Sequence, residues 1–197
     1  MVSITELHRL FRASSGICTD TRQPLPGGIF LALSGPRFNA NAFAAQALEK
    51  GCAYAVVDDP AVATDERFLV VPDTLKALQE LARHHRRTFA FPVIGITGTN
   101  GKTTTKELLH AVLETERATL ATEGNLNNHI GVPLTLLKLK PEHRIAIIEM
   151  GASKRGDIAE LCAIAEPTHG LITNIGKAHL EGFGSVEGVV ATKTELY

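Results

Sequence analysis

Cysteine, net charge and long apolar stretches are all scarce in this sequence of 197 residues. Its three cysteines lie far apart and form no CxxC pair, which argues against a disulfide scaffold or a zinc cage and favours a reducing compartment. The 20 lysines and arginines nearly cancel the 21 aspartates and glutamates, so any phosphate site must be local. No apolar run reaches the roughly 18–20 residues of a membrane span, and the charged N-terminal stretch is unlike an export signal. We therefore expect a cytoplasmic protein with no nucleic-acid partner and no membrane span.

The rest of the composition is that of an ordinary globular protein. Hydrophobic residues make up 44% and charged residues 21% of the chain. The 17 glycines and 9 prolines are too few for a low-complexity or disordered chain. At the usual scale of roughly 150 residues per domain, the length allows one large domain or two small ones.

Strands and helices are predicted to alternate in an N-terminal α/β unit. Helical spacing begins behind Ser3, a possible N-cap. Apolar strands are expected over 29–33, 53–57 and 68–71, and helices over 41–50 and 73–87. The Pro-containing segment 88–92 lacks periodicity, so we predict one domain over 1–90 and a second over 91–197. The basic stretch 84–87 is expected to be a solvated helix end.

The second half predicts a doubly wound parallel sheet of the nucleotide-binding type. Strands are expected over 93–97, 118–121, 144–150 and 170–173, and helices over 102–114, 130–138 and 157–165. The runs 145–148 and 170–173 are continuously apolar, as in a sheet covered on both faces. We expect this domain to be truncated, because the chain ends in a predicted helix after about four strands.

A glycine-rich segment opens the predicted helix at Lys102. Glycines let backbone N–H groups turn toward phosphates, and a helix N-terminus adds positive potential. Lys102 would contact the β- and γ-phosphates of a nucleotide, and the hydroxyl of Thr103 would bind Mg²⁺. The strict Walker pattern G-x-x-x-x-G-K-[ST] is not met, because Ile96 stands where the pattern requires its first glycine. The alternative to a phosphate-binding loop is a glycine turn with a solvated lysine. The residues of this predicted ATP-binding loop are Gly98, Thr99, Asn100, Gly101, Lys102, Thr103 and Thr104.

Three residues further along are candidates for metal chemistry. Glu149 ends an apolar strand, where α/β folds bind ligands, and its carboxylate suits Mg²⁺. The alternative is an acid that caps the next helix. His179 follows the next strand, and a lone histidine is more often structural. Lys193, taken from the residues alone, is more simply an exposed helical lysine.

Four stretches together resemble the Mur ligase family, and within it the MurF branch. They are T-G-T-N-G-K-T-T at 97–104, G-N-L-N-N-H-I-G-V-P-L-T at 124–135, E-M-G-A-S at 149–153 and T-N-I-G-K-A-H-L-E-G-F-G at 173–184. The resemblance implies an ATP-dependent amide-forming enzyme of peptidoglycan precursor synthesis. It covers almost the whole chain, which looks like an N-terminal substrate domain followed by the first part of a P-loop ATPase domain.

The resemblance also assigns roles to single residues. Lys102, His179 and Lys193 would be catalytic. Thr103 and Glu149 would bind one Mg²⁺, and His179 would bind a second together with Lys193, carried as a carbamate. Asn125 and Asn128 would line the substrate site, although a turn-forming role for these asparagines is nearly as well supported by composition.

The first domain is expected to bind the UDP end of the substrate. Thr19-Asp20-Thr21-Arg22 resembles the family motif D-[ST]-R, and Leu33-Ser34-Gly35 resembles its uridine-side loop, so Thr21, Arg22 and Gly35 become substrate contacts. The sequence departs from the family where Gly28 replaces an acid and where F-N-A-N-A-F at 38–43 replaces F-D-G-H-x-F. The alternative for Asp20 and Arg22 is a surface ion pair.

The predicted reaction adds D-Ala-D-Ala to UDP-N-acetylmuramoyl-tripeptide through an acyl phosphate, with ATP and Mg²⁺. A monomer is expected, and this chain alone is expected to have negligible ligase activity because the amine-side domain is missing. Alternatives are a sister Mur ligase that adds a single amino acid, an inactive nucleotide-binding fragment and an unrelated P-loop NTPase.

Overall fold

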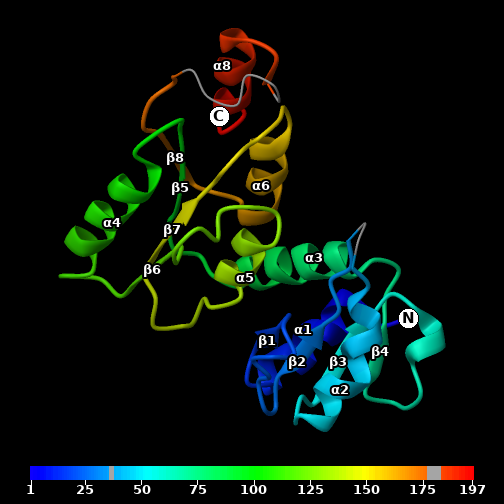
Figure 1. Ribbon diagram of the computed structural model, residues 1–197. Helices are drawn as coiled ribbons and strands as arrows, with labels where there is room; N and C mark the ends of the chain where they lie inside the picture. The colour runs from blue at the N-terminus through cyan, green and yellow to red at the C-terminus, as the bar shows by residue number, and fades with distance from the viewer. Residues whose placement is uncertain (36–37, 177–182) are drawn as a thin grey trace. The chain divides into compact units, whose positions relative to one another are not determined.

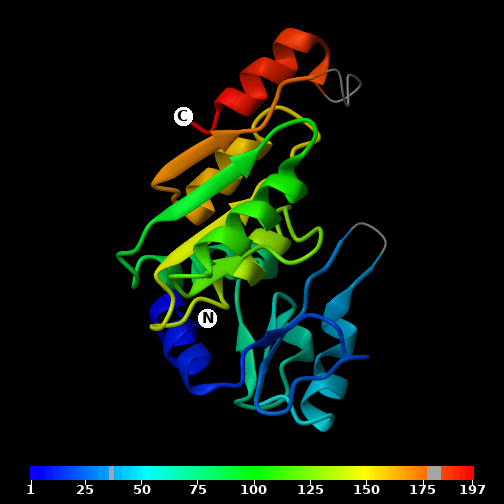
Figure 2. The ribbon, with the colours of Figure 1, turned by 90° about the vertical axis from the view of Figure 1, so that its left-hand side faces the viewer.

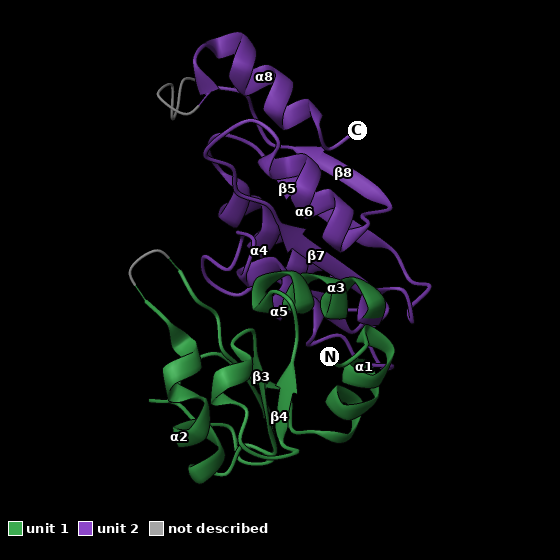
Figure 3. Ribbon diagram, turned by 90° about the vertical axis from the view of Figure 1, so that its right-hand side faces the viewer, with its two compact units in different colours: residues 1–84 green, residues 85–197 purple. Residues whose placement is uncertain are grey.

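The computed structural model describes residues 1–35, 38–176 and 183–197 and divides into two compact units. Unit 1 covers Met1–His84 and unit 2 covers His85–Tyr197 (Figures 1 and 3). The division falls inside helix α3, Thr74–Arg86. None of the described helices is long and apolar enough to cross a lipid bilayer.

Unit 1 is built on a parallel sheet of four strands in the order β1-β2-β3-β4. Its core forms where Phe30 of β2 and Val57 of β3 pack against Ala44 and Leu48 of α2. The first helix begins as predicted, because the hydroxyl of Ser3 accepts a hydrogen bond of 3.2 Å from the backbone N–H of Glu6. The elements of this unit besides α3 are α1 (Ile4–Ala13), β1 (Ile17–Cys18), β2 (Ile29–Leu31), η1 (Ala40–Phe43), α2 (Ala44–Glu49), β3 (Tyr54–Val57), η2 (Pro60–Val62) and β4 (Phe68–Val70).

Unit 2 contains a second parallel sheet of four strands in the order β6-β7-β5-β8. Figures 1 and 2 show α4 on one face of this sheet and α6 on the other, which confirms the doubly wound arrangement. Helix α5 contacts α6 and β7, and α8 contacts α6. The described elements are β5 (Val93–Thr97), α4 (Lys102–Leu113), β6 (Thr119–Ala121), α5 (Gly131–Leu136), β7 (Ile145–Glu149), α6 (Asp157–Ala165), β8 (His169–Ile172) and α8 (Val186–Thr194).

The two strands expected to be covered on both faces differ in the structure. All five residues of β7 are buried, because β7 lies between β6 and β5 in the sheet and helices α4 and α5 contact it. Strand β8 is the last in the order of the described sheet, so His169 is exposed and the other three residues are half-buried. The prediction of a covered strand was therefore right for β7 and wrong for β8.

The basic end of α3 is not the solvated helix end that the sequence predicted. Arg86 is only 6% exposed, and its guanidinium donates hydrogen bonds to the carbonyl oxygens of Phe89 at 2.8 Å, Ala165 at 3.2 Å and Glu166 at 3.3 Å. Two of these acceptors lie at the C-terminal end of α6, where backbone carbonyls have no partner within the helix. Its neighbour Arg87 is exposed and pairs with the carboxylate of Glu166 at 2.6 Å.

We therefore predict that Arg86→Met destabilises the protein far more than Arg87→Met does. Removing the Arg86 guanidinium leaves the buried carbonyl of Ala165 and two part-buried carbonyls without this donor, which should lower the free energy of unfolding by about 2 kcal/mol. Arg87→Met removes only an exposed ion pair and should change stability little. Urea unfolding followed by circular dichroism measures both variants, and equal losses would contradict this role for Arg86.

Candidate functional site

The glycine-rich loop joins the end of β5 to the start of α4, as the sequence predicts. Gly101 has φ 76° and Gly98 has φ 144°, both in the region that side chains disfavour. A Cβ on Gly98 would also clash with the hydroxyl of Thr173. These two glycines therefore allow the tight turn that brings the N-terminus of α4 to the carboxyl edge of the sheet.

A second loop, Thr173–Gly176 after β8, holds the glycine-rich loop in shape. The backbone N–H of Thr99 donates to the carbonyl of Asn174 at 3.0 Å, and the hydroxyl of Thr173 donates to the carbonyl of Asn100 at 2.7 Å. The backbone N–H of Gly176 donates to the Thr99 hydroxyl at 2.9 Å. The loop is thus fixed from outside its own segment, a support that no local pattern in the sequence indicates.

Lys102 folds its ammonium group back over the same loop. Its Nζ donates to the carbonyl of Gly98 at 2.8 Å and to that of Thr99 at 3.3 Å. The positive charge therefore stands beside the backbone N–H groups of the first turn of α4, which have no partners within the helix. This combination of a cation and a helix N-terminus is an anion-binding arrangement.

Glu149 connects the end of β7 to the first turn of α4. Its side chain is buried, with the residue only 1% exposed. One carboxylate oxygen accepts from the hydroxyl of Thr103 at 2.9 Å, and the other accepts from the amide of Asn127 at 2.8 Å. Its backbone N–H donates to the hydroxyl of Thr122 at 2.9 Å. The alternative role as a cap of α6 is filled by other acids, since Asp157 and Glu195 accept from backbone N–H groups there.

The oxygens of Thr103 and Glu149 are suited to Mg²⁺. Among the described residues, no three His, Cys, Asp or Glu side chains cluster so as to hold a metal ion. Mg²⁺ does not need such a cage, because it commonly takes one or two protein oxygens and completes its shell with phosphates and water. The donor pair beside the phosphate-type loop therefore fits a nucleotide-bound Mg²⁺.

Lys193 is not the exposed helical lysine that the residues alone favoured. It lies near the end of α8, is 3% exposed, and has its Nζ 5.6 Å from the centre of the Phe183 ring. The pKa of Lys193 is lowered to about 8, first by burial and second by the positive charge of Lys102, while Asp157 and Glu195 act in the opposite direction. With this pKa, about one-tenth of the Lys193 amine is neutral at pH 7, which is far more than for an ordinary lysine with a pKa of about 10.4.

In the asparagine-rich segment 125–128, one asparagine caps α5 and another contacts Glu149. Asn125 is exposed, whereas Asn128 accepts hydrogen bonds from the backbone N–H groups of Ile130 at 3.1 Å and Gly131 at 2.9 Å at the start of α5. Asn127, the one asparagine of the three that was not chosen for the substrate site, is the member that contacts Glu149. Composition alone does not distinguish it from Asn125 and Asn128. His179 lies outside the described residues.

Unit 1 holds a separate pocket of about 530 Å³. The rings of Phe38 and Phe43 stack there with centroids 5.5 Å apart, and Gly35 pairs with Phe38 through the backbone. Arg22 forms an ion pair with Asp20 at 2.7 Å, and its hydrogen bond lowers the pKa of Asp20 to about 2. The pocket is lined by Thr19, Asp20, Thr21, Arg22, Phe30, Phe38, Ala40 and Phe43. The structure thus places Thr21 and Arg22 in one pocket with Phe38 and Phe43. These two phenylalanines are the aromatic residues that this sequence shares with the family motif.

Comparisons with known proteins agree with this geometry. The Mur ligase middle domain family matches residues 96–197. A UDP-N-acetylmuramoyl-tripeptide–D-alanyl-D-alanine ligase of Synechocystis sp. is 46% identical over 100% of this chain and 43% of its own length.

Two solved structures are also similar to the chain. One is named as the UDP-N-acetylmuramoylalanyl-D-glutamyl-2,6-diaminopimelate–D-alanyl-D-alanyl ligase of Acinetobacter baumannii, with TM-score 0.86, 39% identity and coverage of 99% of this chain and 46% of that one. The other is a MurF ligase of Thermotoga maritima in complex with ADP, with TM-score 0.84, 37% identity and coverage of 91% and 42%. The chain thus spans less than half the length of each of these relatives. By its sequence and its fold, the chain belongs to the Mur ligase family, in the MurF branch.

Proposed function

We propose that this chain supplies the nucleotide-binding and UDP-substrate-binding parts of a ligase that joins D-Ala-D-Ala to UDP-N-acetylmuramoyl-tripeptide. The observation that supports it most is the contact of Thr103 with Glu149 at 2.9 Å beside Lys102, because it joins a phosphate-type loop to a buried carboxylate. The relative from Thermotoga maritima, named as an ADP complex, supports ATP as the nucleotide.

The reaction requires two anions to approach each other. The carboxylate of the tripeptide attacks the γ-phosphate of ATP and displaces ADP, which gives an acyl phosphate. The amine of D-Ala-D-Ala then attacks the acyl carbon, loses a proton and displaces inorganic phosphate to form the amide. Such a transfer depends on positioning and on neutralisation of charge. The backbone of residues 98–104 and the ammonium of Lys102 bind the phosphates in this proposal.

Metal ions supply the remaining positive charge when bound. Thr103 and Glu149 hold one Mg²⁺, and Asn127 keeps the Glu149 carboxylate in place. His179 and a carbamate on Lys193 hold the second. Asn125 and the amide nitrogen of Asn128 orient the substrate carboxylate, since the oxygen of Asn128 is already bonded at the start of α5.

The pocket of unit 1 receives the UDP end of the substrate. The stacked rings of Phe38 and Phe43 offer an apolar surface to the uracil base, and Arg22 and Thr21 contact the diphosphate. Gly35 allows close approach of the backbone. The protein acts as a monomer in the cytoplasm, where a reducing environment keeps its cysteines as thiols. The thiols of Cys18 and Cys52 share a hydrogen bond of 3.7 Å between their sulfurs.

The first test concerns nucleotide binding. Lys102→Ala should weaken the binding of ATP with Mg²⁺ by about 10- to 100-fold, because a charge-assisted hydrogen bond to phosphate is lost. Isothermal titration calorimetry measures the dissociation constant. Lys138→Ala is the matched control, since this lysine is exposed and pairs with Glu123 at 2.7 Å. Equal binding by the wild type and Lys102→Ala would refute the phosphate role of the loop.

The second test concerns the modification of Lys193. Carbon dioxide adds only to the neutral amine and releases a proton, so a pKa of about 8 places carbamate formation within reach of physiological pH. An ordinary lysine, with a pKa of about 10.4, stays charged there. Formation should rise as the pH increases through about 8.

Carbon-13 NMR in labelled bicarbonate detects this carbamate. Besides the carbamate of the N-terminal amine, which every variant shares, we expect one signal that grows with pH, that Lys193→Arg abolishes and that Lys138→Arg leaves in place. A wild-type spectrum identical to that of Lys193→Arg would remove Lys193 from the proposed metal site.

A further inference from the structure

The inward face of α4 changes from apolar to charged along the helix. Leu109 and Leu113 pack against buried isoleucines of β5 and β7. One turn nearer the glycine-rich loop, the same face carries Lys106, three residues before Leu109. Lys106 is 0% exposed and is one of the largest fully buried side chains among the described residues. The helix therefore buries a cation at the end where the nucleotide is proposed to bind.

The buried ammonium group of Lys106 has two acceptors. Its Nζ donates to the backbone carbonyl of Thr122 at 2.5 Å and pairs with the carboxylate of Glu107 at 2.7 Å. The side chain of Glu107 is 60% exposed, so the bond to Thr122 is the one that reaches the interior. Burial of a cation is costly even when it is paired, and an apolar side chain in its place often leaves a protein as stable or more so. Core packing alone therefore does not account for a lysine here, whereas a fixed bond between α4 and Thr122 does.

Thr122 links this ammonium group to the proposed metal site. It directly follows β6 and is 1% exposed, and its backbone N–H donates to the carbonyl of Ile147 in β7 at 3.0 Å. Its hydroxyl accepts a hydrogen bond of 2.9 Å from the backbone N–H of Glu149. Lys106, Thr122 and Glu149 are therefore joined by two successive hydrogen bonds, which run from α4 through the end of β6 to the last residue of β7.

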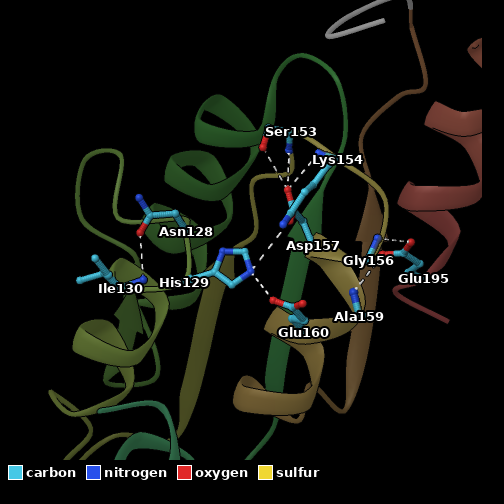
Figure 4. Close-up of polar contacts among 10 residues, drawn as sticks. All are labelled: Asn128, His129, Ile130, Ser153, Lys154, Gly156, Asp157, Ala159, Glu160 and Glu195. Carbon is cyan, nitrogen blue, oxygen red and sulfur yellow. Dashed lines mark hydrogen bonds and ion pairs between the residues drawn. The ribbon is translucent and has the colours of Figure 1, made fainter. Parts of the chain in front are cut away.

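The start of α4 is held in a different way from the start of α6. Figure 4 shows α6, where the carboxylates of Asp157 and Glu195 accept hydrogen bonds from backbone N–H groups of the preceding turn and of the first turn. Helix α4 begins behind Gly101 and has no acid in its first turn, which suits a phosphate site because an acid there would repel phosphates. Its first two turns are instead tied to the strand ends by Thr103 and Lys106.

Of these two ties, only the one from Lys106 is independent of the metal. The hydrogen bond from Thr103 to Glu149 involves the oxygens that the proposed Mg²⁺ site needs as ligands. Once an ion takes these oxygens, this bond no longer sets the spacing between α4 and β7. The bond from Lys106 to the carbonyl of Thr122 lies one helical turn away and shares no atom with that site. It can therefore hold the helix in place both with and without the ion.

We propose that Lys106 is a positioning residue for the metal site. Through Thr122 it fixes the first turn of α4 at the distance from Glu149 at which Thr103 and Glu149 share one Mg²⁺. The inference rests on the proposed function, to which it adds a residue that acts through Thr122 rather than on the nucleotide. Replacing a residue that holds metal ligands in place typically lowers metal affinity by about 10- to 100-fold.

The experiment compares the affinity of the chain for ATP in Mg²⁺ and in EDTA by isothermal titration calorimetry. The ratio of the two dissociation constants, the Mg²⁺ ratio, measures how much Mg²⁺ strengthens binding. Lys106→Met keeps an unbranched side chain of similar length and removes the ammonium group. We expect it to lower the Mg²⁺ ratio by about tenfold. The affinity in EDTA should stay close to that of the wild type, because Lys102 and its loop are unchanged.

Thr122→Val tests the second of the two hydrogen bonds. It keeps the carbonyl that Lys106 contacts and removes the hydroxyl that holds the backbone N–H of Glu149. It should lower the Mg²⁺ ratio in the same way as Lys106→Met. If circular dichroism shows that Lys106→Met does not fold, Thr122→Val decides between the two outcomes.

The matched control is Leu109→Ala, on the same face of α4 but one turn further from the glycine-rich loop. It removes packing between the helix and the sheet without removing a hydrogen bond to Thr122. It should lower the melting temperature, measured by circular dichroism, and keep the Mg²⁺ ratio of the wild type. This variant separates a loss of stability from a loss of positioning.

The outcomes separate this inference from the function on which it rests. A wild-type Mg²⁺ ratio in folded Lys106→Met or in Thr122→Val would overturn the positioning role of Lys106 and leave the ligase proposal standing. An equal fall of the ratio in Leu109→Ala would do the same, because the effect would then be one of stability alone. A wild type that binds ATP no more tightly in Mg²⁺ than in EDTA would overturn the proposed metal site, and this inference with it.

Discussion

The hydrogen bond from Thr103 to Glu149 is the interaction on which the site depends. It joins the first turn of α4 to the carboxyl end of β7 and holds a buried carboxylate beside a phosphate-type loop. A buried acid is costly unless its oxygens find donors, and Thr103 and Asn127 each provide one. Thr103 and Glu149 also offer oxygens to a divalent cation. The parallel sheet brings these groups together, because its strands all end at one edge.

Much of this arrangement could be predicted from the sequence because its signals are local. The glycine-rich turn before Lys102, the cap at Ser3 and the helix over 157–165 each depend on residues within a few positions of one another. The predicted strands of both sheets were found to within a few residues. The two-residue strand β1 was missed, since it is too short for any periodicity.

The features that sequence analysis missed depend on contacts between distant segments. Arg86 was expected in solvent, yet its carbonyl partners at the end of α6 lie 79 and 80 positions along the chain. The resemblance assigns a role to Lys193, but the residues alone did not predict its burial, which exists only in the folded unit. Asn127 gains its role from Glu149, 22 positions away.

The most direct measurement is a double-mutant cycle on the dependence of ATP affinity on Mg²⁺. Thr103→Val and Glu149→Gln each remove one oxygen ligand, and each should reduce the strengthening of ATP binding by Mg²⁺ by about tenfold. If both residues serve one ion, the double variant should lose little more than either single variant, because the two effects are coupled. Losses that simply add, or Mg²⁺ enhancement that persists in the double variant, would contradict a shared metal site at Thr103 and Glu149.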